Sequence, residues 1–171
     1  MESIGSKPES VDLDEHPVVN VIYRETTLED VRDMFTDSLK MGQPWKDWNQ
    51  VRKNVSQLNF FGVTALVEGS ICGMVLWRPD KKTARIFYTW AFEDSERLMA
   101  NMLTLVASHI PAQLKTVSAV INEDSLDLCN HFKAAKFKSI RVLPKIFEGR
   151  DGILFMKPRE ESNVGDVPDE G

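Results

Sequence analysis

One stretch near the middle of the chain constrains the fold most, because the spacing of its apolar residues changes abruptly. Residues 84–93 carry aromatic and β-branched side chains on both faces, which is typical of a central strand covered on each side. The following apolar positions recur at helical intervals, at Leu98, Met102, Leu105, Val106 and His109. The pattern predicts a strand that runs directly into a helix with Asp94 as its N-cap. Such a helix N-terminus can present backbone N–H groups to an anionic ligand.

Composition places the chain among ordinary single-domain globular proteins. It has 171 residues, of which 42% are hydrophobic, enough for a sizeable core. The formal net charge is −5, and no basic run is long enough to follow a phosphate backbone, which argues against nucleic acid as a partner. No segment approaches the ~18 apolar residues that span a bilayer, and the first residues do not resemble a signal peptide. We therefore expect a cytoplasmic protein without a membrane partner.

The two ends differ from the middle in composition. Residues 1–17 and 159–171 are polar and acidic, so we expect a disordered arm and a disordered tail on either side of one domain, residues 18–158. Cys72 and Cys129 lie far apart without a partner pattern, which favours reduced core thiols over a disulfide. The three histidines and two cysteines lack the spacing of metal ligands, so no metal is predicted. The sequence leaves the oligomeric state open.

The remaining segments predict a mixed α/β fold with about seven strands and four helices. Thr27, followed three residues later by Asp30, forms an acidic variant of a capping box at the start of the first helix. A second helix is expected from about Trp45, and the strand after the long helix is reached by a right-handed parallel crossover. The other strands are expected at residues 18–24, 60–67, 71–77, 115–121, 138–142 and 152–156, with a short helix after Ser125 and a loop through Pro144.

This order of elements, with several local sequences, resembles the GNAT acyltransferase superfamily over nearly the whole folded part. Residues 22–30, Ile-Tyr-Arg-Glu-Thr-Thr-Leu-Glu-Asp, are similar to the family's first strand and helix start. The hairpin around Gly73 and the segment from Asn122 to Phe137 are similar to two further family patterns. The resemblance implies a GNAT-like fold in which acetyl-CoA lies between the central strand and the next, with its pantetheine arranged like an added strand. It also implies acyl transfer to an amine of a small molecule or a protein.

The cofactor loop departs from the family pattern. In the family the pyrophosphate rests on the helix N-terminus in a loop of pattern Gln/Arg-x-x-Gly-x-Gly/Ala, whereas residues 94–99 here are Asp-Ser-Glu-Arg-Leu-Met. Asp94 and Glu96 place negative charge where a diphosphate would bind, although Arg97 could replace the glycines by pairing with a phosphate. The resemblance implies that the residues binding the cofactor are Trp90, Ala91, Phe92, Arg97, Leu98, Met99 and Asn122.

Acetyl transfer to an amine requires a base for the amine and an acid for the leaving thiolate. The resembled family often uses a Tyr of the late helix as the acid, but the matching residue here is Phe132, which cannot donate a proton. We expect Glu93 to be the best base candidate, because it ends the predicted central strand, and Tyr88, His131 or Cys129 to supply a further proton-transfer group. The alternatives are a solvated Glu93, a surface His131 and a buried Cys129.

A tryptophan-rich segment, Gly-Gln-Pro-Trp-Lys-Asp-Trp at residues 42–48, lies in the region that shapes the acceptor pocket in the resembled family. Gln43, Trp45 and Trp48 are therefore candidates for binding a substrate or a protein partner, with core packing as the alternative. Two function classes remain. The first is a divergent acyl-CoA-dependent N-acetyltransferase, and the second is a non-catalytic GNAT-like binding or structural protein that has lost acetyl-CoA binding, a kind of copy that viral and phage genomes often carry.

Overall fold

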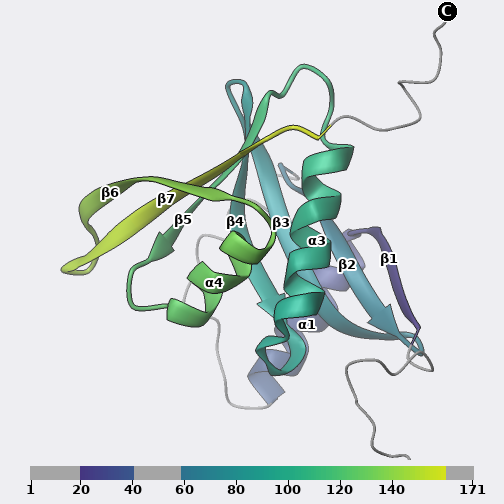
Figure 1. Cartoon of the computed structure of the whole chain (residues 1–171). Helices are drawn as coiled ribbons and strands as arrows, with labels where there is room; N and C mark the ends of the chain where they lie inside the picture. The colour runs from purple at the N-terminus through teal and green to yellow at the C-terminus, as the bar shows by residue number, and fades with distance from the viewer. Residues whose placement is uncertain (1–19, 41–58, 161–171) are drawn as a thin grey trace, which may run out of the picture.

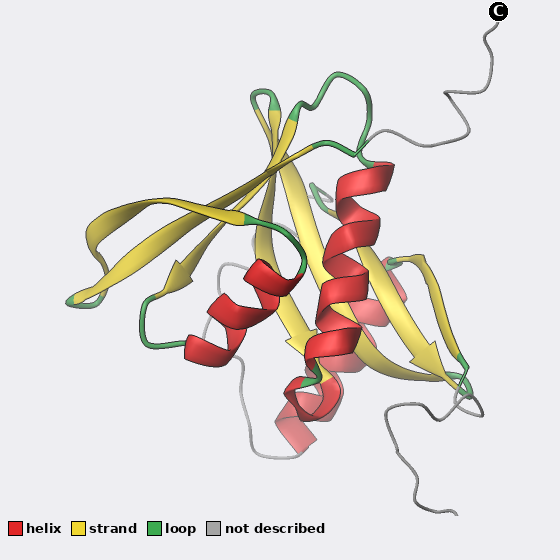
Figure 2. Cartoon of the chain, in the orientation of Figure 1, coloured by secondary structure: helices red, strands yellow, loops and turns green. Residues whose placement is uncertain are grey.

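The computed structural model describes residues 20–40 and 59–160, and in this part of the chain it forms one seven-stranded mixed sheet with helices on both faces (Figures 1 and 2). The strand order is β1-β2-β3-β4-β5-β7-β6. The predicted mixed α/β fold is confirmed, while the helix predicted from about Trp45 lies outside the described residues. The elements are β1 Val21–Glu25, α1 Leu28–Lys40, β2 Phe61–Val67, β3 Ser70–Asp80, β4 Thr83–Ala91, α3 Glu96–His109, β5 Thr116–Asn122, α4 Leu126–Ala134, β6 Lys138–Phe147 and β7 Arg150–Pro158.

The centre of the sheet holds a parallel pair that separates along its length. β4 and β5 are joined through α3, and they pair in parallel at Thr83 with Thr116, Ala84 with Val117 and Arg85 with Ser118. Beyond this point β4 continues to Ala91 beside β3, while β5 continues beside β7. Figure 2 shows the two strands diverging toward the end where α3 and α4 begin. The β5-facing edge of residues 86–91 thus has no strand partner among the described residues.

A β-bulge lies just past the last β4–β5 pair. Leu76 of β3 is opposite Tyr88, but the next residue, Trp77, is opposite Ile86, so Phe87 is the additional residue of β4. Ile86 packs in the core beneath α3, whereas Phe87 and Tyr88 pack in the smaller core on the other face. A bulge bends its strand and increases its twist, which turns the end of β4 away from β5.

Two cores hold the helices to the sheet. The larger one lies beneath α3 and α4, and the smaller one joins Val31 and Met34 of α1 to Met74 and Leu76 of β3. The buried face of α3 is formed by Met99, Met102, Leu103, Val106 and Ala107. The predicted stripe was therefore partly wrong at Leu105 and His109. The neighbouring side of α3 packs against the apolar surface of the sheet instead. No helix in the described ranges is long and apolar enough to span a bilayer.

The last two strands are longer than predicted. β6 extends through Pro144 to Phe147, so the expected loop at Pro144 was wrong. An irregularity in pairing with β7 falls between Leu143 and Phe147, where Lys145 has a φ of 54°. A bulge of this kind accommodates proline in a strand because the ladder is already interrupted there.

The described part of the chain continues past the predicted domain end. The N–H of Arg159 donates to the carbonyl of Lys115, and the N–H of Glu160 donates to the carbonyl of Ala107. Glu160 also pairs with the buried ammonium of Lys157. These contacts attach residues 159 and 160 to the helical face of the sheet. The predicted arm and the rest of the predicted tail, residues 161–171, lie outside the described residues.

The capping box at the start of α1 is confirmed. The N–H of Asp30 donates to Thr27 Oγ1 at 3.1 Å, and the N–H of Thr27 donates to Asp30 Oδ2 at 2.9 Å. Asp30 also accepts two hydrogen bonds from the Arg24 guanidinium, at 2.6 and 2.8 Å, and one from Thr64. Burial alone would raise the pKa of Asp30, but the hydrogen bonds from Arg24 and Thr27 lower it below its ordinary value. The Asp30 carboxylate therefore connects α1 to β1 and β2 in its charged form.

Replacing Asp30 by Asn tests this connection. We expect Asp30→Asn to lower the free energy of unfolding at neutral pH by about 1–2 kcal/mol. The effect should be small for a charged hydrogen-bonded pair, because the Arg24 side chain is partly exposed to solvent. Since the folded-state pKa is depressed, the contribution is present above the unfolded pKa of about 3.9 and is lost as the pH falls through the folded-state pKa.

Urea unfolding between pH 2 and pH 7 measures both effects. Asp33→Asn is the matched control, because Asp33 is exposed on the same helix, and its effect should stay within about 0.5 kcal/mol. Equal effects of the two substitutions, or an Asp30 effect that persists at pH 2, would contradict this account of Asp30.

Candidate functional site

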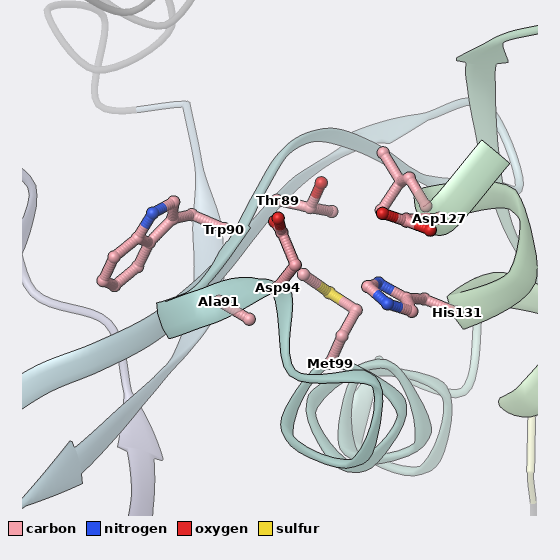
Figure 3. A pocket seen from close by; sticks show the side chains of 8 residues that line it. Thr89, Trp90, Ala91, Asp94, Met99, Asp127 and His131 are labelled. Atoms are coloured by element: carbon pink, nitrogen blue, oxygen red, sulfur yellow. The ribbon is translucent and has the colours of Figure 1, made fainter. Parts of the chain in front are cut away.

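A pocket of about 120 Å³ lies at the end of β4, between the starts of α3 and α4 (Figure 3). β4 and the turn after it contribute Thr89, Trp90, Ala91 and Asp94, while α3 contributes Met99 and α4 contributes Asp127, Leu128 and His131. The divergence of β4 from β5 opens this region, because the chain leaves each strand in a different direction. Figure 3 shows Asp94, Asp127 and His131 around the pocket and the Trp90 ring directed away from it.

The turn from β4 into α3 differs from the prediction in two respects. β4 ends at Ala91 rather than at Glu93, because residues 92–94 form a single 3₁₀ turn in which Glu93 and Asp94 have left-handed φ values of 54° and 51°. The N-cap of α3 is Ser95 rather than Asp94, since Ser95 has the extended conformation that a cap requires. Its Oγ accepts from the N–H of Leu98 at 3.2 Å. The side chain of Ser95 thus occupies one of the donors that an anion would use.

Two consecutive left-handed residues other than glycine are uncommon and cost free energy. Here they are Glu93 and Asp94, at the turn where the resembled family has its cofactor loop. Asp94 contributes to the lining of the pocket and Glu93 does not, and both residues remain exposed. Asp94 and the first-turn residue Glu96 make this end of α3 acidic.

His131 is buried, so the alternative of a surface histidine was wrong. Its exposed fraction is 6%, and its Nδ1 atom has no hydrogen-bond partner among the described residues. Asp127 lies one helical turn earlier on α4, so both side chains reach the same pocket. A buried nitrogen without a partner destabilises the fold. The His131 side chain as a whole lines the pocket.

Phe132, at the position where the resembled family carries a tyrosine, belongs to the core. Its exposed fraction is 0%, and its ring lies 5.0 Å from Phe137 in an edge-on arrangement and 5.6 Å from Phe155, centre to centre. The neighbouring position on α4, His131, faces the pocket instead. α4 therefore places the imidazole of His131 at the pocket and packs the phenyl ring of Phe132 in the core.

The other proposed proton-transfer groups lie outside the pocket lining. Tyr88 packs in the core on the α1 face, and its burial raises the pKa of its hydroxyl far above the usual range. Burial also raises the pKa of the Cys129 thiol, although Lys133 opposes this shift. Cys72 and Cys129 are both free thiols, as expected. Tyr88 and Cys129 therefore hold their protons tightly at neutral pH.

The proposed cofactor-binding residues are placed in three different ways. Ala91 and Met99 line the pocket together with the backbone of Trp90. Phe92 and Arg97 are exposed at the turn and on the first turn of α3, while Leu98 packs against the larger core. Asn122 ends β5, and its Oδ1 accepts from the N–H of Asp124, which shapes the turn into α4. The proposed substrate residues Gln43, Trp45 and Trp48 lie outside the described residues.

Sequence reasoning missed Thr89, Asp127 and Leu128 as lining residues. The spacing of Asp127 and His131 was a usable signal, because residues four apart share one face of a helix. Nothing in the spacing showed that this face meets the end of β4. That contact depends on the path of β5 and of the turn that follows it.

The comparisons with known proteins agree with this geometry at the level of the fold. No family model matches the sequence, and no curated protein matches it. Solved structures do match. A GNAT-family acetyltransferase from Bacillus cereus has a TM-score of 0.64 at 16% identity, covering 82% of this chain and 99% of that one. The ribosomal alpha-N-protein acetyltransferase RimL has a TM-score of 0.63 at 12% identity, covering 84% and 95%.

A eukaryotic structure has the same fold. Arabidopsis thaliana NAA60, in complex with a bisubstrate analogue, has a TM-score of 0.59 at 13% identity, covering 81% of this chain and 98% of that one. The chain therefore has the GNAT acetyltransferase fold, and at these identities the similarity establishes the fold alone.

A single added hydroxyl tests whether Phe132 is a core residue. We expect Phe132→Tyr to lower the free energy of unfolding by about 1–3 kcal/mol, because the hydroxyl would be buried among aromatic rings without a partner. Phe92→Tyr is the control, since Phe92 is 56% exposed and should change stability by less than about 0.5 kcal/mol. Guanidinium unfolding measures both. A Phe132→Tyr variant as stable as the parent would show that this position opens to the pocket.

Proposed function

We propose that the protein is an N-acyltransferase that takes its acyl group from acetyl-CoA and transfers it to an amine. The observation that carries the proposal is the end of the β4–β5 pairing at Arg85 and Ser118. It leaves the backbone groups of residues 86–91 on that edge without a strand partner in the described residues, and an extended pantetheine arm can bond to them as an added strand would. The similarity to N-acetyltransferase structures supports the same conclusion.

We assign the proton transfer to His131. Its imidazole lines the pocket at the end of the open edge, where a thioester bound along β4 would end. In the transfer, the amine nitrogen bonds to the acyl carbon as the C–S bond breaks, the imidazole takes the proton that the amine loses, and the leaving thiolate receives a proton from it. Glu93 is exposed beside Asp94 and remains a candidate for receiving the proton through water. Tyr88 requires no role in this scheme.

The diphosphate of acetyl-CoA would lie near the acidic start of α3. Arg97 is the residue that we propose to pair with it, since a guanidinium can replace several backbone donors. Asp94 and Glu96 oppose this binding, so we expect the affinity to depend on Arg97 more than it would in a protein with a glycine-rich loop. Gln43, Trp45 and Trp48 are proposed to bind the acceptor substrate.

A second candidate function is supported by the Ser95 cap. Ser95 already bonds the N–H of Leu98, so one of the free donors at the start of α3 is satisfied without an anion, and Asp94 adds negative charge nearby. The corresponding candidate is a GNAT-fold binding or structural protein without the cofactor. One experiment separates the two candidates.

The experiment is a thermal melt with and without millimolar acetyl-CoA. A ligand that binds the native state and is present at 100 times its Kd adds ~2.7 kcal/mol, which raises the midpoint by several degrees for a domain of this size. We expect the shift in the parent protein and its loss in Arg97→Ala. Arg32→Ala, which removes an exposed arginine from α1, should retain the shift. The absence of any shift in the parent would reject the acyltransferase and favour the binding protein.

A further inference from the structure

A row of directly opposed residues crosses the sheet from β3 to β6 at the last pair of β4 and β5. Arg78 of β3 is opposite Arg85 of β4, and Arg85 is opposite Ser118 of β5. The row continues through Met156 of β7 to Lys138 of β6. Side chains opposite each other on neighbouring strands share one face of the sheet and begin about 5 Å apart. The row therefore places two guanidinium groups side by side, with a lysine at its far end.

This row lies on the face of the sheet that carries α1. The residues next to it along the strands belong to the larger core beneath α3 and α4, namely Trp77, Ala84, Ile86, Val117 and Phe155. Because successive side chains of a strand point to opposite faces, the row points away from that core. Figure 1 shows α1 behind the sheet and both α3 and α4 in front of it.

The two arginines are only partly balanced by acidic groups. Like charges directly opposite each other destabilise a sheet. Arg78 is half-buried, and its Nε is buried without a hydrogen-bond partner among the described residues. Arg85 pairs with Asp80 at 3.7 Å and its side chain stays 42% exposed. Lys81 and Lys82, in the turn between β3 and β4, add further positive charge, in a chain whose formal net charge is −5.

We propose that Arg78, Arg85 and Ser118 bind the dianionic phosphate group of a small ligand, either free phosphate or a phosphomonoester. A guanidinium can donate two parallel N–H bonds to an oxyanion, and a tetrahedral phosphate has enough oxygens to accept from both arginines at once. A carboxylate, with two oxygens and one charge, matches the pair less well. The hydroxyl of Ser118, beside Arg85, is a further donor. A bound phosphate would offset the repulsion between the two arginines.

This phosphate site is separate from the diphosphate position proposed at the start of α3. Arg97 belongs to α3, which covers the other face of the sheet. Ala91, the last residue of β4 and part of the pocket lining, follows Arg85 by six residues, roughly 20 Å along an extended strand. The phosphate site therefore does not depend on the proposed acyl transfer.

Nuclear magnetic resonance titration at pH 8 and constant ionic strength, with inorganic phosphate and with methyl phosphate, tests the proposal. We expect saturable shifts of the Arg85 and Ser118 amides at millimolar concentrations. Binding should be at least 10-fold weaker in Arg78→Gln and in Arg85→Gln, because each loses charged hydrogen bonds. Arg32→Gln, which removes an exposed arginine from α1, is the control and should bind as the parent does. Acetate should bind at least 10-fold more weakly than phosphate.

Melts in phosphate-free buffer establish that each variant is folded, and phosphate should raise the midpoint of the parent more than that of either Gln variant. Binding of methyl phosphate identifies a monoester as the ligand, and binding of inorganic phosphate alone identifies the free ion; both support the site. The proposal is overturned if neither phosphate gives saturable shifts, if both Gln variants bind as the parent does, or if acetate binds equally well.

Acetyl-CoA separates this proposal from the proposed enzyme. Phosphate binding that acetyl-CoA abolishes would place the phosphates of the cofactor at these arginines and overturn the separate site. Phosphate binding without a shift of the melt by acetyl-CoA would reject the acyltransferase and keep the phosphate site. An acetyl-CoA shift without phosphate binding would reject the phosphate site and keep the enzyme.

Discussion

The separation of β4 from β5 after three paired positions is the constraint on which the candidate site depends. A continuous parallel ladder would use the backbone groups of both strands along their whole length, and α3 and α4 would then cover a closed surface. The bulge at Phe87 follows directly after the last pair and turns the strand. The pocket, the left-handed turn and the N-terminus of α3 all lie beyond this point. A sequence change that straightened β4 would therefore alter the site without touching any of its lining residues.

Electrostatics at the start of α3 distinguish this chain from the family that its fold resembles. Helix N-termini attract anions through their free N–H groups, but here Ser95 bonds one of them and Asp94 and Glu96 add negative charge nearby. Of these two carboxylates, Asp94 also lines the adjacent pocket, together with Asp127. In the proposed acyltransferase, Arg97 would therefore have to hold the acyl-CoA against the negative charge of this turn.

Much of the fold could be predicted from the sequence because its signals are local. Thr27 and Asp30 predict the start of α1, and the change in the spacing of apolar residues after residue 93 predicts α3. The candidate site was harder to predict from the sequence. The sequence does not reveal the bulge at Phe87, because β4 has aromatic residues on both faces. A strand with the bulge and one without it would both bury apolar side chains. The burial of His131 follows from tertiary contacts among Phe132, Phe137 and Phe155 that set the rotation of α4. The N-cap of α3 is Ser95 and not the predicted Asp94, because residues 92–94 form a turn that residue preferences do not predict.

Amide hydrogen exchange of β4, measured residue by residue, tests most directly the claim that its β5-facing edge is an open binding edge. The account predicts that the amides of residues 86–91 that face β5 exchange faster than those that face β3, and that acetyl-CoA protects them. Slow exchange at both edges without a ligand would mean that the edge is already paired. Exchange that acetyl-CoA leaves unchanged while it raises the melting midpoint would place the cofactor elsewhere and contradict the account.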